Sequence, residues 1–453
     1  MENKILYTIP KTWLLLLFVI LLSGNLLFAQ EKKQKQKEEK QTTQEEYYIT
    51  DYLRHENFIY NPLIKTVMLH LEENELSAPV MKLNSNNVLK LSFDILDLEL
   101  KNYMYAFIHC DADWAPSALH EAEYLDGFFE NYITDYQFSF NTLERYMHYN
   151  LFFPNDNINF TASGNYLLVV YEEGNRDKPV ITRRFMVYEE KVIVNPNVVR
   201  AADPMERSLK QKIDFSILHN GYNILNPMQD LRVAVLQNNR WDNANTTLKP
   251  LFIKESELVY NYDSENLFYG GNEFRNFDIK TIRFKTENVR DITYEDGKNN
   301  VFLKEDRVLS TNRYSTLPDI NGKYVIRIQE GWDSDLEADY AYVHFNLKYP
   351  TPLVDGNLYI FGAISDWNFH NDYKLKYDPE SLSYHTTLYL KQGYYNYSYS
   401  FLEDGTNTGN SYLIDGSYFE TENDYSIFVY HREPSTNYHK IIGYRQFNSR
   451  GPF

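Results

Sequence analysis

The sequence has almost no cysteine, the residue that a reactive thiol or a disulfide framework would require. Its 453 residues include a single cysteine, Cys110. One cysteine cannot form an intramolecular disulfide, so a small disulfide-stapled fold is excluded. Adjacent side chains in a strand point to opposite faces, and Cys110 directly follows His109. We therefore expect Cys110 to behave as a small buried hydrophobic residue and not as a catalytic thiol.

Motifs that bind cofactors or metals are also missing. The P-loop, the dinucleotide fingerprint, the zinc-type Cys/His pairs and the G-x-S-x-G elbow do not occur. Close carboxylate pairs carry no specific signal in a chain with 63 acidic residues. Asp111 and Asp113 could help to bind calcium, but the same residues can close a turn after a strand, which we favour. The sequence predicts no enzyme, no catalytic residue, no metal and no cofactor.

Positive charge is scarce relative to negative charge. The 45 Lys and Arg residues face 63 Asp and Glu residues, for a formal charge of -18. Such a surface repels phosphate backbones and anionic headgroups, which argues against nucleic acid and against electrostatic membrane docking. Aromatic residues are abundant instead, at 16% with 40 tyrosines. Tyr and Phe favour strands, and Tyr suits interfaces that are half wet.

A long apolar run occurs only at the N-terminus. Lys4 and Lys11 precede the apolar residues 13–22, and Ala29 offers a small residue for cleavage. This order predicts a secretory signal peptide over residues 1–29 and export to the periplasm. The run is shorter than the roughly 20 residues that span a bilayer, so we expect no transmembrane segment in the mature chain. An uncleaved anchor and an outer-membrane barrel are the alternatives, although Pro452 fits an internal barrel strand badly.

Residues 30–46 carry mainly Lys, Gln, Glu and Thr and are predicted to be a disordered charged leader. After this leader the pattern is that of strands. Residues 341–347 and 395–401 alternate between apolar and polar side chains, and residues 165–171 and 231–236 are continuous apolar runs of strand length. Gly, Asn and Asp turn signals separate them. We predict an all-β chain of tandem immunoglobulin-like β-sandwich domains.

Pro-rich joints suggest where these domains begin and end. We predict an N-terminal β-sandwich over residues 47–190, a middle β domain over residues 191–348 and a C-terminal sandwich over residues 349–453. The breaks fall near residues 195–197 and 349–352, which contain prolines.

The C-terminal block has a recognisable pattern of strands and turns. Residues 358–363 predict a strand with a glycine, Trp367 follows in the next loop, and Gly393 joins two further strands. This pattern resembles the early-set, immunoglobulin-like modules related to glycogen-binding domains. In glycan-binding members of that group, exposed aromatics stack on sugar faces. The resemblance makes an α-glucan-like ligand the alternative function, with Trp367 as the stacking residue or as a core residue.

Six further stretches form a distinctive set. They are HCDADW at 109–114, YLDGF at 124–128, SFNTL at 139–143, QNNRWD at 237–242, GGNEFR at 270–275 and ETENDY at 420–425. Together, and in this order, they resemble the plug proteins of the type IX secretion system, a family long described as a domain of unknown function. The likeness extends from about residue 47 to residue 444, with a longer charged leader here.

The resemblance implies a non-catalytic periplasmic protein at the inner face of the outer membrane. Such a protein binds the periplasmic mouth of a large outer-membrane β-barrel translocon and plugs it. Within this hypothesis, the candidate partner-binding residues are Trp114, Trp241, Glu273, Arg275 and Trp367. Glu273 and Arg275 would share a face if their segment is extended and could pair with each other.

Overall fold

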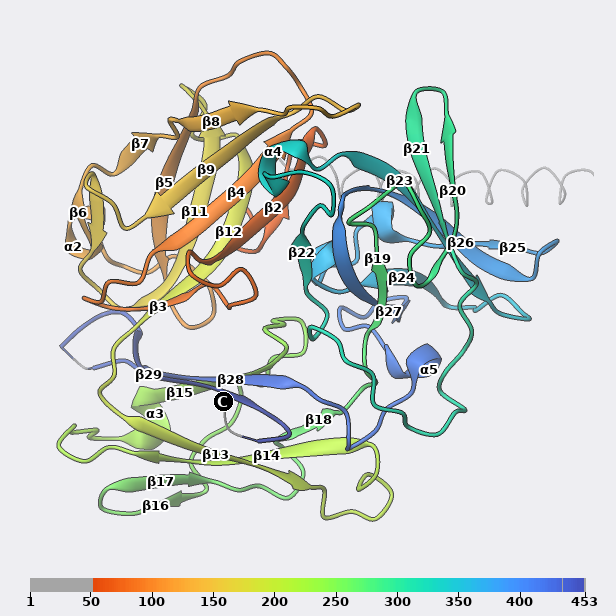
Figure 1. Ribbon diagram of the computed structural model, residues 1–453. Coiled ribbons are helices and arrows are strands. Elements are labelled where there is room, and N and C mark those ends of the chain that lie inside the picture. The colour runs from red at the N-terminus through yellow and green to blue at the C-terminus, as the bar shows by residue number, and fades with distance from the viewer. Residues whose placement is uncertain (1–51, 434, 452–453) are drawn as a thin grey trace, which may run out of the picture. The chain divides into compact units, whose positions relative to one another are not determined.

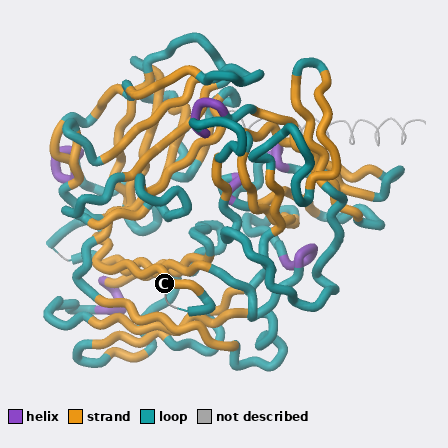
Figure 2. Tube along the Cα trace, in the orientation of Figure 1, coloured by secondary structure: helices purple, strands orange, loops and turns teal. Residues whose placement is uncertain are grey.

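The computed structural model describes residues 52–433 and 435–451 (Figure 1). The predicted signal peptide and charged leader lie outside these residues. Strands predominate and helices are short, which confirms the all-β prediction (Figure 2). Within the described residues, no helix has the length and apolar character needed to cross a membrane.

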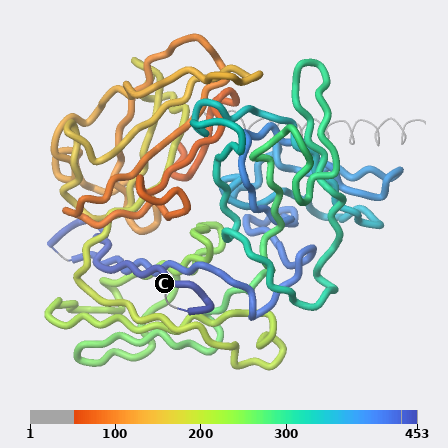
Figure 3. Tube along the Cα trace, in the orientation of Figure 1, coloured from red at the N-terminus to blue at the C-terminus, as the bar shows by residue number. Residues whose placement is uncertain are grey.

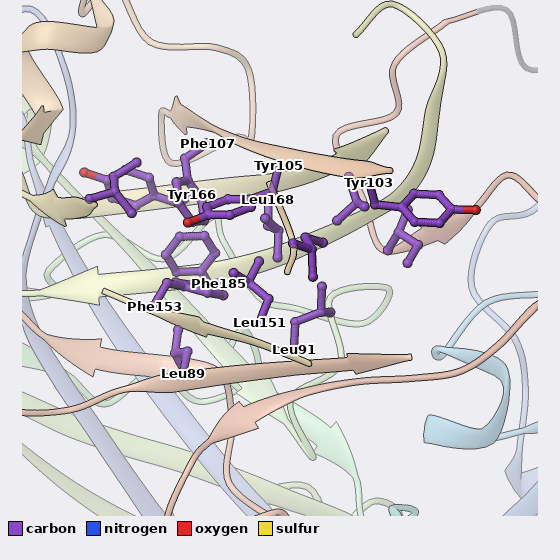
Figure 4. Packing of buried hydrophobic residues seen from close by; sticks show 14 of the residues in the cluster. Leu89, Leu91, Tyr103, Tyr105, Phe107, Leu151, Phe153, Tyr166, Leu168 and Phe185 are labelled. Carbon is purple, nitrogen blue, oxygen red and sulfur yellow. The ribbon is translucent and has the colours of Figure 1, made fainter. Parts of the chain in front are cut away.

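The first sandwich is built from strands β1 to β12. Its two sheets enclose one apolar core, in which Phe107, Tyr166 and Phe185 from one sheet face Leu91 and Phe153 from the other (Figure 4). β11 is buried along almost its whole length, and part of it lies near β29 of the second sandwich. One sheet consists of β1 (Phe58–Ile59), β12 (Pro179–Tyr188), β11 (Gly164–Glu172), β5 (Tyr103–Cys110), β7 (Glu130–Tyr132) and β3 (Val80–Lys82). The other consists of β2 (Ile64–Leu71), β4 (Leu89–Ile95), β9 (Met147–Phe153) and β8 (Asp135–Phe138). A small ribbon of β6 (Leu125–Gly127) and β10 (Ile158–Phe160) follows α2 (Glu121–Tyr124).

The second sandwich combines segments that are far apart in the sequence. Its core packs residues such as Ile213 and Leu258 of one sheet against Val233 and Ile427 of the other. The first sheet consists of β13 (Ile193–Arg200), β14 (Lys210–Leu218), β17 (Glu257–Tyr260), β16 (Phe252–Ile253) and β18 (Leu267–Tyr269). The second sheet consists of β15 (Leu231–Gln237), preceded by α3 (Pro227–Asp230), with β28 (Asp424–His431) and β29 (Lys440–Asn448).

The third sandwich lies between these segments in chain order. Its core contains Phe277, Val343, Phe345 and Tyr399. One sheet consists of β19 (Arg275–Asp278), β27 (Gly393–Glu403), β22 (Tyr324–Ile326) and β24 (Gly356–Phe361). The other consists of β20 (Val289–Glu295), β21 (Lys298–Leu303), β23 (Tyr340–Lys348), β26 (Ser383–Lys391) and β25 (Lys376–Asp378). Its short helices are α4 (Ser334–Glu337), η1 (Ala363–Ser365), η2 (Asn371–Tyr373) and α5 (Tyr412–Asp415).

The pairing of strands divides the chain differently from the predicted boundary at residues 348/349. β15 pairs with β28 from the last part of the chain, with Leu231 opposite His431. β23 pairs with β26 across that boundary, with Tyr340 opposite Lys391. Figure 3 shows the blue C-terminal segment beside the green strands of the second sandwich. We therefore propose sandwiches of residues 58–188, of 193–269 with 424–448, and of 275–403.

A buried cluster of charges joins the first and third sandwiches. The Asp94 carboxylate is fully buried and accepts hydrogen bonds from His148 Nδ1 at 2.6 Å, Tyr340 OH at 2.7 Å and Lys391 Nζ at 2.7 Å. His148 Nε2 lies 3.5 Å from the Asp335 carboxylate. Burial alone would raise the pKa of Asp94, but Lys391 and His148 together lower it. The cluster thus holds both carboxylates ionised.

This cluster predicts a loss of stability between about pH 6.5 and pH 9. Burial would lower the pKa of His148, but its hydrogen bonds to Asp335 and Asp94 raise it to about 9. The folded chain therefore keeps a proton that the unfolded chain, with a histidine pKa of about 6.5, has released. We expect the free energy of unfolding to fall by on the order of 3 kcal/mol across this range. Urea unfolding at pH 6 and pH 9 measures it. A His148→Gln variant should lose this pH dependence, and an equally steep fall in the variant would contradict the assignment.

Candidate functional site

Two of the predicted tryptophans meet where the first and second sandwiches join. Trp114 follows β5 and is 5% exposed, and Trp241 lies in the loop after β15. Their rings are perpendicular, with centroids 5.1 Å apart. The Arg184 guanidinium of β12 lies 4.3 Å from the centroid of the Trp114 ring. Burial lowers the pKa of Arg184 to about 10, which leaves it charged at neutral pH. The structure brings these two residues together as an internal aromatic and cationic contact.

Trp367 occupies a similar position between the second and third sandwiches. It follows η1 and packs edge-on against Phe361 and Phe274, with centroids 5.4 and 5.9 Å away. The Arg240 guanidinium lies 5.4 Å from the Trp367 ring centroid and is itself held by both carboxylate oxygens of Asp242. Glycan binding stays a prediction. It requires that an α-glucan column retains the wild-type protein and does not retain the Trp367→Ala variant.

Glu273 and Arg275 do not pair with each other. Arg275 begins β19 and donates to the carboxylates of Asp415 and Asp306, with distances of 2.7 and 2.8 Å. Burial alone would lower the pKa of Arg275, but these two carboxylates raise it. Glu273 lies before the strand and accepts from Arg450 at 2.8 Å. Glu273 lies outside β19, which begins at Arg275, and each of the two side chains has its ion-pair partners elsewhere.

Of the predicted residues, Trp241 and Trp367 line a cavity of about 160 Å³ at the junction, whereas Glu273 lines a separate cavity. Arg183, Arg184, Trp241, Lys323 and Trp367 are among its lining residues. Arg183 Nη2 is 3.0 Å from the Asp366 carboxylate, so part of this positive charge is neutralised within the chain. Drug-sized ligand pockets commonly measure about 300–1,000 Å³, so the cavity is small for such a ligand. In this arrangement the five predicted residues contact other parts of the chain, and their contact with a partner stays a prediction.

The loop after β5 forms a turn. The Asp113 carboxylate accepts from the amide of Ala115 at 3.3 Å, and Trp114 N donates to the carbonyl of Asp111 at 2.9 Å. The Asp111 carboxylate accepts from the His439 amide and from His439 Nδ1, both at 2.9 Å. Asp113 therefore closes the turn, as the turn interpretation expects, whereas the Asp111 carboxylate makes a long-range contact with His439.

We expect the thiol of Cys110 to be unreactive in the folded protein. Its side chain is buried, and burial raises its pKa to about 12, so almost no thiolate exists at neutral pH. A thiol reagent such as dithionitrobenzoate should react with less than about a tenth of an equivalent of thiol in the native protein. After unfolding it should react with one equivalent. Rapid reaction of the native protein would contradict the burial of this side chain.

Comparison with known proteins connects this fold to a family. A family model described as the type 9 secretion system plug protein 1st domain matches residues 64–189. The crystal structure of a hypothetical protein from Parabacteroides merdae, at 2.30 Å resolution, is 33% identical and has a TM-score of 0.85. That match covers 87% of this chain and 100% of the other. Residues 64–189 belong to the type IX secretion system plug protein family. No curated protein matches it.

Members of the plug family are non-catalytic components of secretion, so this chain has a role related to type IX secretion. The residues that match the family model, 64–189, run from the beginning of β2 to just beyond β12. They make up nearly the whole first sandwich. They also contain an exposed apolar segment at residues 128–143, in which β8 is exposed along its full length at the edge of its sheet. Its exposed side chains are Phe128, Tyr132, Tyr136, Phe138, Phe140 and Leu143.

This segment was missed by the sequence interpretation, as was a second exposed residue, Trp332. Aromatic residues separated by polar ones in residues 128–143 read as ordinary half-buried strands. Trp332 offers one local signal, because it stands between Gly331 and Asp333 in an acidic loop without apolar neighbours. Large contiguous patches of exposed apolar side chains often mark surfaces that other molecules cover, whereas singly exposed ones are ordinary.

Proposed function

We propose that this chain is a non-catalytic periplasmic component of the type IX apparatus. It binds the periplasmic mouth of a large outer-membrane β-barrel translocon and closes the pore while no substrate passes. The chain reaches the periplasm by its predicted signal peptide and stays at the inner face of the outer membrane.

The observation that carries the proposal is the match between the first sandwich and the plug domain. That sandwich is closed by an aromatic core and is tied to the rest of the chain through Asp94 and the Trp114 contact. A plug has to resist deformation at a pore, and a body joined through buried contacts suits this task. The exposed segment 128–143 supplies aromatic surface of the kind that protein interfaces favour.

Catalysis receives no support from Cys110, His109 or the buried Asp94 cluster, although the pKa values of these groups are shifted. Cys110 is buried as the neutral thiol. Burial lowers the pKa of His109 to about 4, so its ring is neutral at physiological pH. The carboxylates of Asp94 and Asp335 balance the charges of His148 and Lys391 in the buried cluster. Shifted pKa values can mark active sites, but structural ion pairs produce the same shifts.

The proposal is tested by deleting the gene and measuring outer-membrane permeability to a large antibiotic that an intact outer membrane excludes. Deletion should sensitise the cells, and the wild-type gene should restore resistance. A gene that lacks codons 2–29 should fail to restore resistance, because its product would stay in the cytoplasm. Unchanged permeability of the deletion strain, with the translocon present, would overturn the proposal.

A further inference from the structure

The most exposed aromatic side chain in the described part of the chain is Trp332, with an exposed fraction of 100%. It lies in the loop between β22 and α4 of the third sandwich. Tryptophan is a large side chain that folded proteins usually bury for the most part. Where it does stand on a surface, it is among the residues that contribute most to protein binding.

The backbone around Trp332 is held in place by several hydrogen bonds. The amides of Trp332 and Asp333 donate to Glu337 Oε1 at 3.0 and 2.9 Å, and these bonds lower the pKa of Glu337. The Asp333 carboxylate caps α4 by accepting from the amide of Asp335 at 2.9 Å. Gly331 has φ +149°, and a Cβ there would lie 2.3 Å from Ile328 Cδ1, so the turn requires glycine. A surface ordered before binding loses little conformational entropy when a partner arrives.

A second loop, from the first sandwich, brings more apolar side chains to the same place. The Phe140 amide donates to the Leu336 carbonyl at 2.9 Å, and Tyr146 OH donates to the Asp335 carbonyl at 3.0 Å. Figure 1 shows α4 beside the first sandwich. We call this surface the Trp332 patch. It consists of Trp332, Phe138, Phe140 and Leu143, and each of the last three is more than half exposed.

The border of the Trp332 patch is acidic. Residues 330–337 contain four acidic residues and no Lys or Arg. Asp335 is paired with Lys90 and His148, whereas Glu330 and Asp333 form no ion pair within residues 52–433 and 435–451. An apolar surface with an acidic border complements a pocket with a basic rim, and it repels anionic lipid headgroups.

We propose that the Trp332 patch docks onto a protein partner, with the indole of Trp332 inserted into an apolar pocket whose rim carries Lys or Arg. This inference rests on the proposed function for the identity of the partner, which is then the periplasmic end of the translocon barrel. Since the anchor comes from the third sandwich and Phe138, Phe140 and Leu143 come from the first, the partner contacts two sandwiches at once and holds them in one orientation.

The first test is affinity purification of the full-length protein from solubilised outer membranes. Trp332→Ala should reduce the amount of co-purified barrel by about tenfold or more, as loss of an interface anchor does. Phe252→Ala, an equally simple truncation of an exposed aromatic in the second sandwich, should leave the amount unchanged. Both variants should melt like the wild type. Capture of the barrel should also weaken as the salt concentration rises.

The outcomes separate the two proposals. If the wild type captures the barrel and Trp332→Ala captures as much, the docking inference is overturned and the proposed function stands. If the wild type captures no barrel, the proposed function is overturned. The inference is then decided by a photo-crosslinking benzoylphenylalanine at position 332 in living cells. An adduct with an outer-membrane protein, absent when the probe is at position 252, supports it. No adduct, an adduct with lipid or an adduct with a second copy of this chain overturns it.

Discussion

Replacing Lys391 with methionine should lower the free energy of unfolding by about 3–5 kcal/mol. The Lys391 ammonium and the Asp94 carboxylate are both fully buried and lie 2.7 Å apart. Methionine would fill much of the same volume but would leave the buried Asp94 carboxylate with His148 as its remaining cation. The loss measures a buried carboxylate that has lost one of its two cations, and not the strength of the pair itself. Guanidinium unfolding, followed by circular dichroism, gives the value.

Two controls make this result interpretable. Lys82→Met removes a cation from an exposed pair with Glu190 and should leave the unfolding midpoint unchanged. A double variant, Asp94→Asn with Lys391→Met, should recover a large part of the lost stability, because the buried charge disappears with its partner. A Lys391→Met protein as stable as the wild type would show that Asp94 is solvated or protonated, contrary to the cluster described above.

Trp114→Ala should be about as destabilising, by about 3–5 kcal/mol. The ring is buried against Trp241 and Arg184, and its removal leaves a cavity where the first two sandwiches join. Trp332→Ala is the matched control, because the same substitution at a fully exposed position should change stability by less than about 0.5 kcal/mol.

A double-mutant cycle refines this prediction. Trp114→Ala and Trp241→Ala together should show a coupling of about 0.5–1.5 kcal/mol, as expected for two aromatic rings in contact. Additive losses would mean that the two rings contribute independently and that the junction is held by other contacts. Equilibrium unfolding of the four proteins in the cycle supplies the measurement.

Local patterns in the sequence identified individual strands well. The alternation over residues 341–347 became β23, and the continuous apolar run at residues 165–171 became β11. Both signals work because the side-chain period of a strand is set by its own backbone, whatever it pairs with.

Which strands pair was not predictable in the same way. β28 is buried at every position and carries no local feature that selects β15, about 190 residues earlier, as its neighbour. The proline-containing joint near residue 349 looked like a domain boundary, yet β23 and β26 pair across it. Pairing between distant strands depends on the shape and register of whole sheets, which a single sequence does not display.

The tryptophans show the same limit for the site. Trp114 and Trp332 both stand beside aspartate in polar loops, yet one is buried and the other is fully exposed. The difference comes from what packs on them, which for Trp114 includes Arg184 and Trp241 from other parts of the chain. Likewise, the partners of Arg275 lie 31 and 140 residues away, so its pairing could not be read from Glu273 nearby.

Pore closure is measured most directly by single-channel recording. The outer-membrane barrel recovered with this protein would be reconstituted alone in a planar bilayer, and purified plug-family protein would be added to its periplasmic side. We predict an open channel whose conductance falls to that of the bare bilayer, with no effect when the protein is added to the opposite side. A channel that keeps its full conductance with the protein in excess on either side would contradict the account.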